Sequence, residues 1–546
     1  MVALPSWLEP LPDAERMRAI DRWAIETRGV PSLDLMERAG AGVARAVERL
    51  DPDGPVAVFC GAGNNGGDGL VVARLLRDAG RRVTVLLAGS VEKLSGDALV
   101  NFERLPGEPP AEVSASAAAG AASAGAAAGA GAEEVGAGAL AATDAIGRAL
   151  GEAGIVVDAL LGTGFAGEPK GAVASAIAAI ETWAGPVVSI DVPSGVDAST
   201  GEVAGPAVKA TVTVTFHAAK PGLWINPGKA KAGEVEVIDI GIPKGAPVEA
   251  EIGLISTAAL GLLPRRDAQS TKFTSGHVLV AGGSRGLTGA PRMAALGAMR
   301  AGAGYVTACV PASLQAIIAS GGPPELMTRG LPDEDGMLAP ASVEVVLEGA
   351  RRGGALALGP GLGRSEPAVA FARALAARAE VSLVLDADGL NAHAHTKTGG
   401  HLGDLAGRRS PTVLTPHPGE LARLLETDAA HIASARLACA REAAARARAV
   451  VVLKGDDTLI VDPDGAVAVS PGASPALATA GTGDVLCGVI SALLAGGLEP
   501  FAAASAGVLL HARAGRLAAE AVGAAEGVIA SDVIAALPAA REDGNE

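Results

Sequence analysis

Ala478-Thr-Ala-Gly-Thr-Gly-Asp-Val-Leu-Cys-Gly488 is the stretch that decides the fold around it. Gly481 and Gly483 allow the backbone to turn tightly and to expose successive N–H groups. The apolar segment from Val485 to Leu494 predicts a helix whose N-terminal donors point at the same spot, which makes an anion site. Asp484, in the first helical turn, has the chemistry of a general base for a hydroxyl near a phosphate. A glycine turn before an N-capped helix would have the same sequence. Gly481–Asp484 alone therefore do not distinguish an anion site from a purely structural turn.

The rest of the second half repeats one pattern, a short apolar strand that ends in a polar or glycine-containing loop. The expected pairs of strand and loop are 277–281 with 282–291, 355–358 with 359–363, 382–385 with 386–391, 412–415 with 416–420, and 450–454 with 455–458. Strands that alternate with helical segments predict an α/β domain with a ligand site along one edge of its sheet.

The first half opens with two expected helices between Asp13 and Leu50, the second of them capped by Ser32. The strand Val56–Cys60 follows, then a glycine loop, a helix from Leu70 to Ala79 and a second strand from Arg82 to Ala88. This is a βαβ unit, and its loop lies where open α/β sheets bind ligands.

The glycine loop, Gly61-Ala-Gly-Asn-Asn-Gly-Gly-Asp-Gly69, is not the usual dinucleotide fingerprint. Its Asn64, Asn65 and Asp68 offer hard oxygen ligands that suit a cation or ribose hydroxyls. A polar turn is the alternative, but five glycines and three such side chains exceed what a turn requires.

Two aspartates follow later strands of the first half. Asp158 belongs to the strand 155–161, and Asp191 follows the strand 187–190. They could be structural caps, but beside the Asn-rich loop we favour a shared polar site. Lys220, after the strand 212–216, is a candidate cation for it.

Two segments separate ordered parts of the chain. Residues from about 107 to 140 are mostly Ala, Gly and Ser, which predicts a flexible insertion without function, although a loosely packed Ala helix is an alternative. Residues 241–275 are linker-like and predict domains at 1–245 and 246–546.

Composition limits the class of protein. The 546 residues are too many for one ordinary core, and 49% are hydrophobic. A net charge of −16 disfavours nucleic-acid and anionic-membrane partners. The four scattered cysteines fit a reducing cytoplasm and argue against disulfides or a cysteine zinc site. We expect no signal peptide and no membrane span.

These motifs, in this order, resemble the bifunctional NAD(P)H-hydrate repair enzymes. The first half resembles the NAD(P)HX epimerase domain and implies a Rossmann-like three-layer α/β/α fold. The second half is similar to the ribokinase-like, ADP-dependent NAD(P)HX dehydratase, also α/β/α. The motifs that carry the likeness are Leu35–Gly40, Gly61–Gly69, Asp158–Gly164, Asp191–Gly195, Lys220–Gly222, Gly359–Gly363, Thr415–Glu420, Lys454–Thr458 and Gly481–Asp484.

The resemblance implies a role for each matching residue. In the first domain the hydrate would be held by Asn64, Asn65, Gly66, Gly67, Asp68, Gly162, Thr163, Gly164, Phe165, Ala166, Gly167, Glu168 and Asp191, and K⁺ by Asn65, Asp158 and Ser194. In the second, Ala290, Gly361, Gly363, His417 and Asp484 would contact the hydrate. Lys454, Gly455, Asp456, Asp457, Thr458 and Gly483 would hold the adenine nucleotide. Asp484 and Asp191 would be the catalytic residues.

The resemblance also implies the partners and the reaction. NADHX and NADPHX would be epimerised and then dehydrated with ADP and Mg²⁺, which gives NAD(P)H, AMP and phosphate. The expected protein is a cytoplasmic homo-oligomer. The sequence departs from the family pattern at Ser270–Gly276, which leaves a role for Lys272 open. His417, between two prolines, could also serve only to shape a turn.

Two other functions compete with this interpretation. The second half could be a vitamin-type kinase that transfers a phosphoryl group from ATP to a hydroxymethyl group, since Gly481–Asp484 would serve either reaction. The first half could be a noncatalytic binding domain, although the presence of Asn65, Asp158, Asp191 and Ser194 favours an active site.

Overall fold

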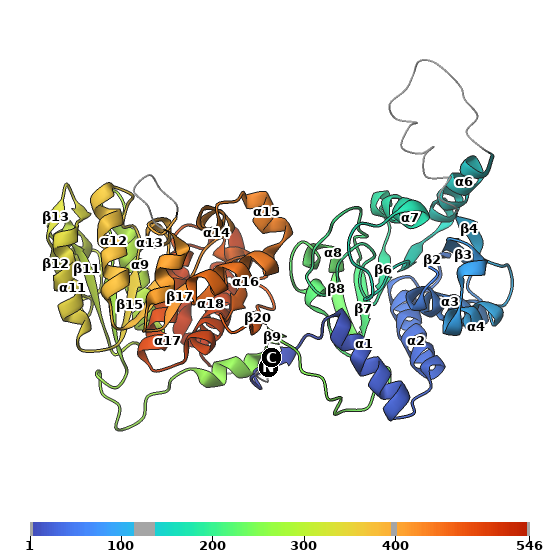
Figure 1. Ribbon diagram of the computed structural model, residues 1–546, viewed down its shortest axis with the longest axis horizontal. Coiled ribbons are helices and arrows are strands. Elements are labelled where there is room, and N and C mark those ends of the chain that lie inside the picture. The colour runs from blue at the N-terminus through green and yellow to red at the C-terminus, as the bar shows by residue number, and fades with distance from the viewer. Residues whose placement is uncertain (1–3, 114–136, 395–400, 543–546) are drawn as a thin grey trace, which may run out of the picture. The chain divides into compact units, whose positions relative to one another are not determined.

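The computed structural model describes residues 4–113, 137–394 and 401–542. The chain divides into two compact units (Figure 1). The first unit is Pro10–Ala250. The second consists of Met1–Glu9 together with Glu251–Glu546, so the beginning of the chain belongs to the unit that contains its end.

The first unit contains a seven-stranded sheet whose neighbouring strands are all parallel. In spatial order the strands are β4 (Ala111–Val113), β3 (Val83–Ala88), β2 (Val56–Cys60), β5 (Ile155–Ala159), β6 (Val187–Ile190), β7 (Val212–Phe216) and β8 (Glu234–Ile238). The strand order reverses between β2 and β5, which is where doubly wound sheets form a ligand crevice.

Helices cover both faces of this sheet. One face carries α1 (Ala14–Arg22) with a π-helical turn (Trp23–Thr27), α2 (Ser32–Leu50), α3 (Asn64–Asp78) and α4 (Gly96–Glu103); α6 (Ala137–Glu152) and α7 (Gly171–Thr182) cover the other, and the short α8 (Lys229–Ala232) precedes β8. Strand β2 shows the alternation: Val56 and Val58 pack toward α2 and α3, while Ala57 and Phe59 pack toward α7.

The second unit contains an eleven-stranded sheet. In spatial order its strands are β1 (Leu8–Pro10), β9 (Ile252–Ile255), β20 (Val467–Val469), β19 (Leu459–Val461), β18 (Val450–Leu453), β17 (Thr412–Leu414), β16 (Ser382–Leu385), β15 (Ala355–Leu358), β10 (His277–Ala281), β11 (Tyr305–Pro311) and β12 (Met327–Leu331), and a separate hairpin joins β13 (Asp333–Glu334) to β14 (Met337–Leu338). Strands β18 to β12 run parallel, whereas β19 is antiparallel to both of its neighbours.

Helices again cover both faces. The helices of the C-terminal half are α9 (Gly289–Arg300), α10 (Gln315–Ser320), α11 (Val343–Ala350), α12 (Glu366–Arg378), α13 (Asp388–Asn391), α14 (Pro418–Leu425), α15 (Ala429–Ser434), α16 (Arg436–Ala447), α17 (Thr482–Ala495), α18 (Pro500–Val522) and α19 (Ala530–Ala540). Along β10, Val278 and Val280 pack with α9, α17, α18 and α19 in one core, whereas Leu279 points toward α11.

The fold class expected from the sequence is confirmed in both units: each is a three-layer α/β/α arrangement around a mainly parallel sheet. Three local predictions were wrong. The cap of α2 is Pro31 instead of Ser32, and α3 begins at Asn64 instead of Leu70 because the glycine loop itself winds into the first helical turn. Strand β4 occupies 111–113, inside the expected insertion, because it pairs with β3 as an edge strand. The remainder of that insertion lies mostly outside the described residues.

No helix in the described parts of the chain is both long and apolar enough to cross a lipid bilayer.

Candidate functional sites

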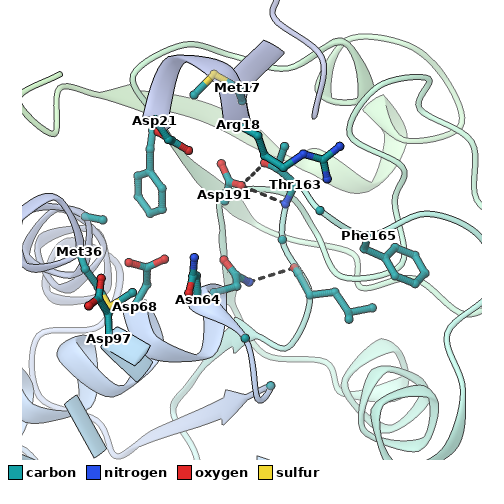
Figure 2. A pocket seen from close by; sticks show the side chains of 18 of the residues that line it. Met17, Arg18, Asp21, Met36, Asn64, Asp68, Asp97, Thr163, Phe165 and Asp191 are labelled. Carbon is teal, nitrogen blue, oxygen red and sulfur yellow. Dashed lines mark hydrogen bonds between the residues drawn. The ribbon is translucent and has the colours of Figure 1, made fainter. Parts of the chain in front are cut away.

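The first site is a cavity of about 710 Å³ beside the carboxyl ends of β2, β5 and β6 (Figure 2). Parallel strands bring the loops that follow them to one edge of the sheet. Of the residues that the sequence assigned to this site, the cavity is lined by Asn64, Asn65, Asp68, Gly162, Thr163, Gly164, Phe165 and Asp191. Gly66 and Gly67 are buried in the first turn of α3, and Ala166, Gly167 and Glu168 are exposed; these five are not part of the lining.

Asp191 lies at the centre of a hydrogen-bonded network. Its Oδ1 atom is 2.6 Å from Lys220 Nζ, and its Oδ2 atom accepts hydrogen bonds from the backbone N–H (3.1 Å) and the hydroxyl of Thr163. Lys220 also donates to the Thr215 hydroxyl at 2.8 Å. Asp191 has a φ of 66°, which is uncommon for a residue other than glycine and recurs at functional sites.

The network keeps Asp191 ionised. Burial alone would raise the pKa of Asp191, but the charge of Lys220 and the hydrogen bonds from Lys220 and Thr163 outweigh burial and lower it. Asp191 is 8% exposed, so the cavity contains a carboxylate that is both fixed in position and negatively charged.

Asp158 and Ser194 lie together beneath the loop that follows β5. Asp158 is fully buried and accepts hydrogen bonds from the Ser194 hydroxyl (2.5 Å), the Ser194 N–H (2.9 Å) and the Ser189 hydroxyl (2.9 Å). Within the described chain no lysine or arginine pairs with it, and burial raises its pKa. Asn65 joins the group because its amide donates to the Leu161 carbonyl (2.9 Å), and Leu161 N–H donates to Ser194 Oγ (2.9 Å). The three residues predicted to hold K⁺ are thus brought together.

Three further charged residues line the cavity and were not assigned from the sequence. Asp21 and Arg18 come from α1, and Asp97 from the first turn of α4 (Figure 2). The pKa of Asp21 is raised, first by burial. For Arg18 and Asp21 the only sequence signal was a charged position inside an expected helix, which solvent exposure explains equally well. No helix was predicted around Asp97.

The second site follows the carboxyl ends of β18, β17, β16, β15 and β10, and it includes the N-terminus of α17. Gly481 has a φ of 91°, and a Cβ there would lie 2.4 Å from Met293 Sδ. Asp484 lies in the first turn of α17, as predicted. Burial, then the negative charge of Asp386, raises its pKa to about 7, although Lys454 acts in the opposite direction. This value suits a general base at neutral pH.

Lys454 is the cation of the second site. Its Nζ atom is 2.9 Å from Asp386 Oδ1 and 3.9 Å from Glu420 Oε2, and it lies 3.5 Å from the position that a Cβ on Gly483 would take. Burial would lower the pKa of Lys454, but the two carboxylates outweigh burial and raise it. The lysine therefore stays protonated beside the helix N-terminus that was predicted to bind phosphate.

The remaining predicted residues cluster around this centre. Gly361 approaches Ala290, since a Cβ on Gly361 would lie 3.0 Å from Ala290 Cβ. Gly363 N–H donates to Asp388 Oδ2 at 3.0 Å, and the charge of Asp388 also raises the pKa of Asp484. Asp388 thus connects the two parts of the site: it binds the glycine loop after β15, and its charge acts on Asp484.

His417 is the N-cap of α14. Its Nδ1 atom accepts the N–H groups of Gly419 (3.0 Å) and Glu420 (3.3 Å), and its Nε2 atom is 3.5 Å from Glu420 Oε1. Burial lowers the pKa of His417, which therefore remains neutral at pH 7. The hydrogen bonds accepted by Nδ1 are those expected of a residue that shapes the turn, and about half of the His417 side chain stays exposed.

The loop after β18 contains two kinds of residue. Gly455 and Asp456 are exposed, whereas Asp457 is buried and pairs with Arg436 Nε at 2.8 Å. The Thr458 hydroxyl donates to the Gly455 carbonyl at 2.7 Å. The side chains of Asp457 and Thr458 thus fix the shape of the loop. The Gly455 N–H also donates to Thr458 Oγ1 (3.1 Å), and the Asp456 carbonyl accepts the Ala473 N–H (3.1 Å).

Each of the two units has a mainly parallel sheet with buried charged residues at its carboxyl edge. These features define the chain as an α/β enzyme with two sites. The family model described as YjeF-related protein N-terminus matches residues 32–222, and the model for NAD(P)H-hydrate dehydratase matches residues 278–539.

The chain belongs to the family of bifunctional NAD(P)H-hydrate repair enzymes. It is 41% identical over 535 residues to the enzyme of this name, Nnr, from Moorella thermoacetica, covering 96% of this chain and 95% of the relative. It is 39% identical over 548 residues to the Nnr of Salinibacter ruber, with 97% and 95% covered. The resemblance found in the sequence is confirmed, and the family is favoured over the vitamin-type kinase.

Among solved structures, the chain is similar to the ADP/ATP-dependent NAD(P)H-hydrate dehydratase of Bacillus subtilis, co-crystallised with ATP and Mg²⁺. The sequences are 31% identical, the match covers 52% of this chain and 94% of the other, and the TM-score is 0.43.

Proposed function

We propose that this chain repairs hydrated NADH and NADPH in two steps: the first unit interconverts the R and S hydrates, and the second dehydrates the S form with ADP, releasing NAD(P)H, AMP and phosphate. The observation that carries the proposal is that relatives named for this activity match almost the whole chain, through both sites. We assign the epimerase to residues 1–245 and the dehydratase to 246–546, with strand β1 as a structural part of the second.

In the epimerase site, Asp191 exchanges a proton with the hydroxyl next to the ring nitrogen. Lys220 and Thr163 hold the carboxylate in place and keep it ionised, so it is ready to accept a proton. The loop residues Asn64 to Asp68 and Gly162 to Glu168 surround the dinucleotide. The exposed residues Ala166, Gly167 and Glu168 would reach it by closure of their loop.

Potassium fits the group formed by Asn65, Asp158 and Ser194. The fully buried Asp158 carboxylate has no cationic partner in the described chain, and its neighbours are neutral oxygen donors. A monovalent cation there would balance the buried charge and attract a substrate oxygen.

In the dehydratase site, Asp484 accepts the proton of the substrate hydroxyl as that oxygen attacks the terminal phosphoryl group of ADP. The N–H groups at Gly481–Gly483 and the ammonium of Lys454 stabilise the charge on the transferring group. The carbon–oxygen bond of the phosphate ester then breaks, driven by the lone pair of the ring nitrogen, and phosphate leaves; loss of a proton from the neighbouring ring carbon to solvent gives NAD(P)H. Ala290, Gly361, Gly363 and His417 contact the hydrate, and the backbone from Lys454 to Thr458 and Gly483 holds the nucleotide.

Mg²⁺ fits beside the nucleotide. It usually takes one or two carboxylates together with phosphate oxygens and waters, and Asp386 and Asp484 supply carboxylates next to the phosphate loop. Bound there, the ion would neutralise charge on the phosphates. A homo-oligomeric state and a cytoplasmic location stay predictions of the sequence.

An assay that follows products tests the proposal. The full chain is mixed with S-NADHX, Mg²⁺ and ADP, and the mixture is analysed for NADH, AMP and free phosphate. Stoichiometric NADH and phosphate support the dehydratase. A stable phosphate ester would mean a kinase. In a separate incubation with R-NADHX, binding without conversion to the S hydrate would mean that the first unit is a binding domain.

A further inference from the structure

Asp68 is a buried residue whose carboxyl has no partner among the described residues. It is the fifth residue of α3 and is 8% exposed, yet it has no hydrogen bond and no ion pair within the described residues. Its carboxyl is directed into the cavity of the first unit (Figure 2). A carboxyl of a largely buried residue that faces a cavity and meets no protein partner calls for a functional explanation.

The charged groups around Asp68 come from every element that packs near it. Asp21 and Arg18 approach from α1, Asp97 from α4, and Asp191 with Lys220 from the ends of β6 and β7. Burial, then the negative charges of Asp191, Asp21 and Asp97, raises the pKa of Asp68 well above its usual value. Asp191, in the same cavity, has a lowered pKa because Lys220 and Thr163 bind it. Two carboxyls with opposite shifts in one cavity are the arrangement of a general acid and a general base.

We propose that Asp68 is the second proton-exchanging residue of the epimerase site, acting on the substrate from α3 while Asp191 acts from the end of β6. This inference rests on the proposed epimerase function and adds a residue that contacts the reacting atoms.

Asp68 in its neutral form gives its proton to the departing hydroxyl, which leaves as water while the carbon–oxygen bond breaks and the ring nitrogen lone pair forms the iminium. A solvent water then attacks the same carbon from the other face, and Asp191 takes its proton as the electron pair returns to nitrogen. Asp68 ends ionised and Asp191 neutral. In the reverse conversion Asp191 donates the proton and Asp68 accepts one. Alternatively, proton exchange with solvent restores neutral Asp68 and ionised Asp191.

This path predicts exchange of oxygen with solvent. In water enriched in ¹⁸O, each newly formed epimer should carry one solvent oxygen at the hydroxyl. Retention of the original oxygen would contradict the proposal, because a ring-opened path keeps that oxygen and requires no second carboxyl.

The variant test uses the full chain, so that the dehydratase serves as an internal control. Asp68→Asn should slow interconversion of R- and S-NADHX by about a hundredfold or more, whereas dehydration of pure S-NADHX with ADP continues as in the wild type. Asp68→Glu should recover part of the rate. The matched control is Asp78→Asn in the same helix, whose carboxylate is exposed and pairs with Arg74; it should leave both activities unchanged.

Thermal unfolding separates a catalytic role from a structural one. A carboxyl with a raised pKa in the folded state destabilises the fold at neutral pH, because the unfolded chain ionises it more readily. Asp68→Asn should therefore unfold at a temperature no lower than the wild type. A variant that folds, binds NADHX and epimerises at close to the wild-type rate would overturn the proposal. If the wild type itself does not epimerise, the proposed function fails instead.

A second variant keeps the test decisive if Asp68→Asn does not fold. Asp97→Asn removes a negative charge that raises the pKa of Asp68, so the loss of epimerase activity at rising pH should move to lower pH. A pH profile of kcat that does not change would contradict a role for protonated Asp68.

Discussion

Asp484 is the residue on which the dehydratase mechanism depends, and its pKa makes a testable prediction. The residue acts as a base only when it is ionised, and burial with Asp386 nearby raises its pKa to about 7. We expect kcat for dehydration to fall as the pH drops below about 7 and to level off above it. Above pH 7, where Asp484 is ionised, Asp484→Asn should lose about a hundredfold or more in kcat, and it should lack the fall of the wild-type profile at lower pH. Wild-type activity that stays constant well below neutral pH would exclude Asp484 as the base.

The ion pair between Lys220 and Asp191 leads to a prediction about the free energy of unfolding of the first unit. Their side chains are 2% and 11% exposed, and removal of one partner leaves a buried charge unpaired. We expect Lys220→Met to lower the free energy of unfolding of the first unit by about 3–5 kcal/mol. Urea unfolding followed by tryptophan fluorescence measures this, because three of the four tryptophans, Trp23, Trp183 and Trp224, lie in that unit.

The control for this variant is Lys231→Met, which breaks a partly exposed pair with Glu181. A surface pair contributes about 0–1 kcal/mol. Equal losses in the two variants would show that Lys220 is not held as a buried counter-ion.

For single residues of the first site, the sequence predicted those at the ends of strands and missed those that lie on helices. Asp191 could be found because it directly follows a buried strand, Asp158 because it lies near the end of one, and Lys220 because it belongs to the loop after another; such positions lie at the sheet edge. Asp21 and Asp97 could not, because their place in the cavity depends on how α1 and α4 pack against α3, and helical periodicity does not determine that.

Helix α17 is the element that presents the phosphate loop, and it packs closely on α9. A Cβ on Gly488 would lie 1.9 Å from the Ala294 carbonyl oxygen. We therefore expect Gly488→Ala to push the two helices apart, to destabilise the second unit by about 1–3 kcal/mol, and to reduce dehydratase activity by displacing Asp484.

Gly349→Ala in α11 is the matched control, because its new Cβ would meet only ordinary contacts near 3.6 Å. Denaturation monitored by dehydratase activity compares the two variants. If Gly488→Ala were as stable and as active as Gly349→Ala, close packing of α17 on α9 would not be what positions the loop.

Element boundaries could be predicted where the apolar runs were long and failed where they were short. The strands 277–281, 355–358 and 382–385 were predicted at their observed bounds, because each is a continuous buried run of a parallel sheet. Strands β1 and β4, three residues each, exist only through their pairing with β9 and β3. No local pattern of three residues could have shown this.

For the whole molecule, the first strand links the beginning of the chain to the second unit. Trp7 is 7% exposed, its ring centroid is 5.7 Å from that of Phe501, and its carbonyl accepts the N–H of Ser256 at 3.1 Å. We expect Trp7→Ala to destabilise the dehydratase unit by about 3–5 kcal/mol and to leave the epimerase unit unchanged.

Thermal inactivation of the two activities in one sample tests this. Dehydratase activity of the Trp7→Ala protein should be lost at a lower temperature than in the wild type, and Trp7→Phe, which keeps an aromatic ring, should lie between them. Loss of both activities in parallel would contradict an independent second unit that includes the N-terminus.

The division into two α/β units followed from length and from the linker-like composition of 241–275. The sequence did not predict that residues 4–9 belong to the second unit, because the pairing of β1 with a strand far along the chain cannot be recognised from local sequence.

The central claim is that one chain repairs both hydrates, and one measurement tests it most directly. An epimeric mixture of NADHX is incubated with the full chain, K⁺, Mg²⁺ and ADP, and recovery of the NADH absorbance is followed to completion. The account predicts full recovery. Recovery that stops at the fraction of the S epimer, or no recovery with either ADP or ATP, would contradict it.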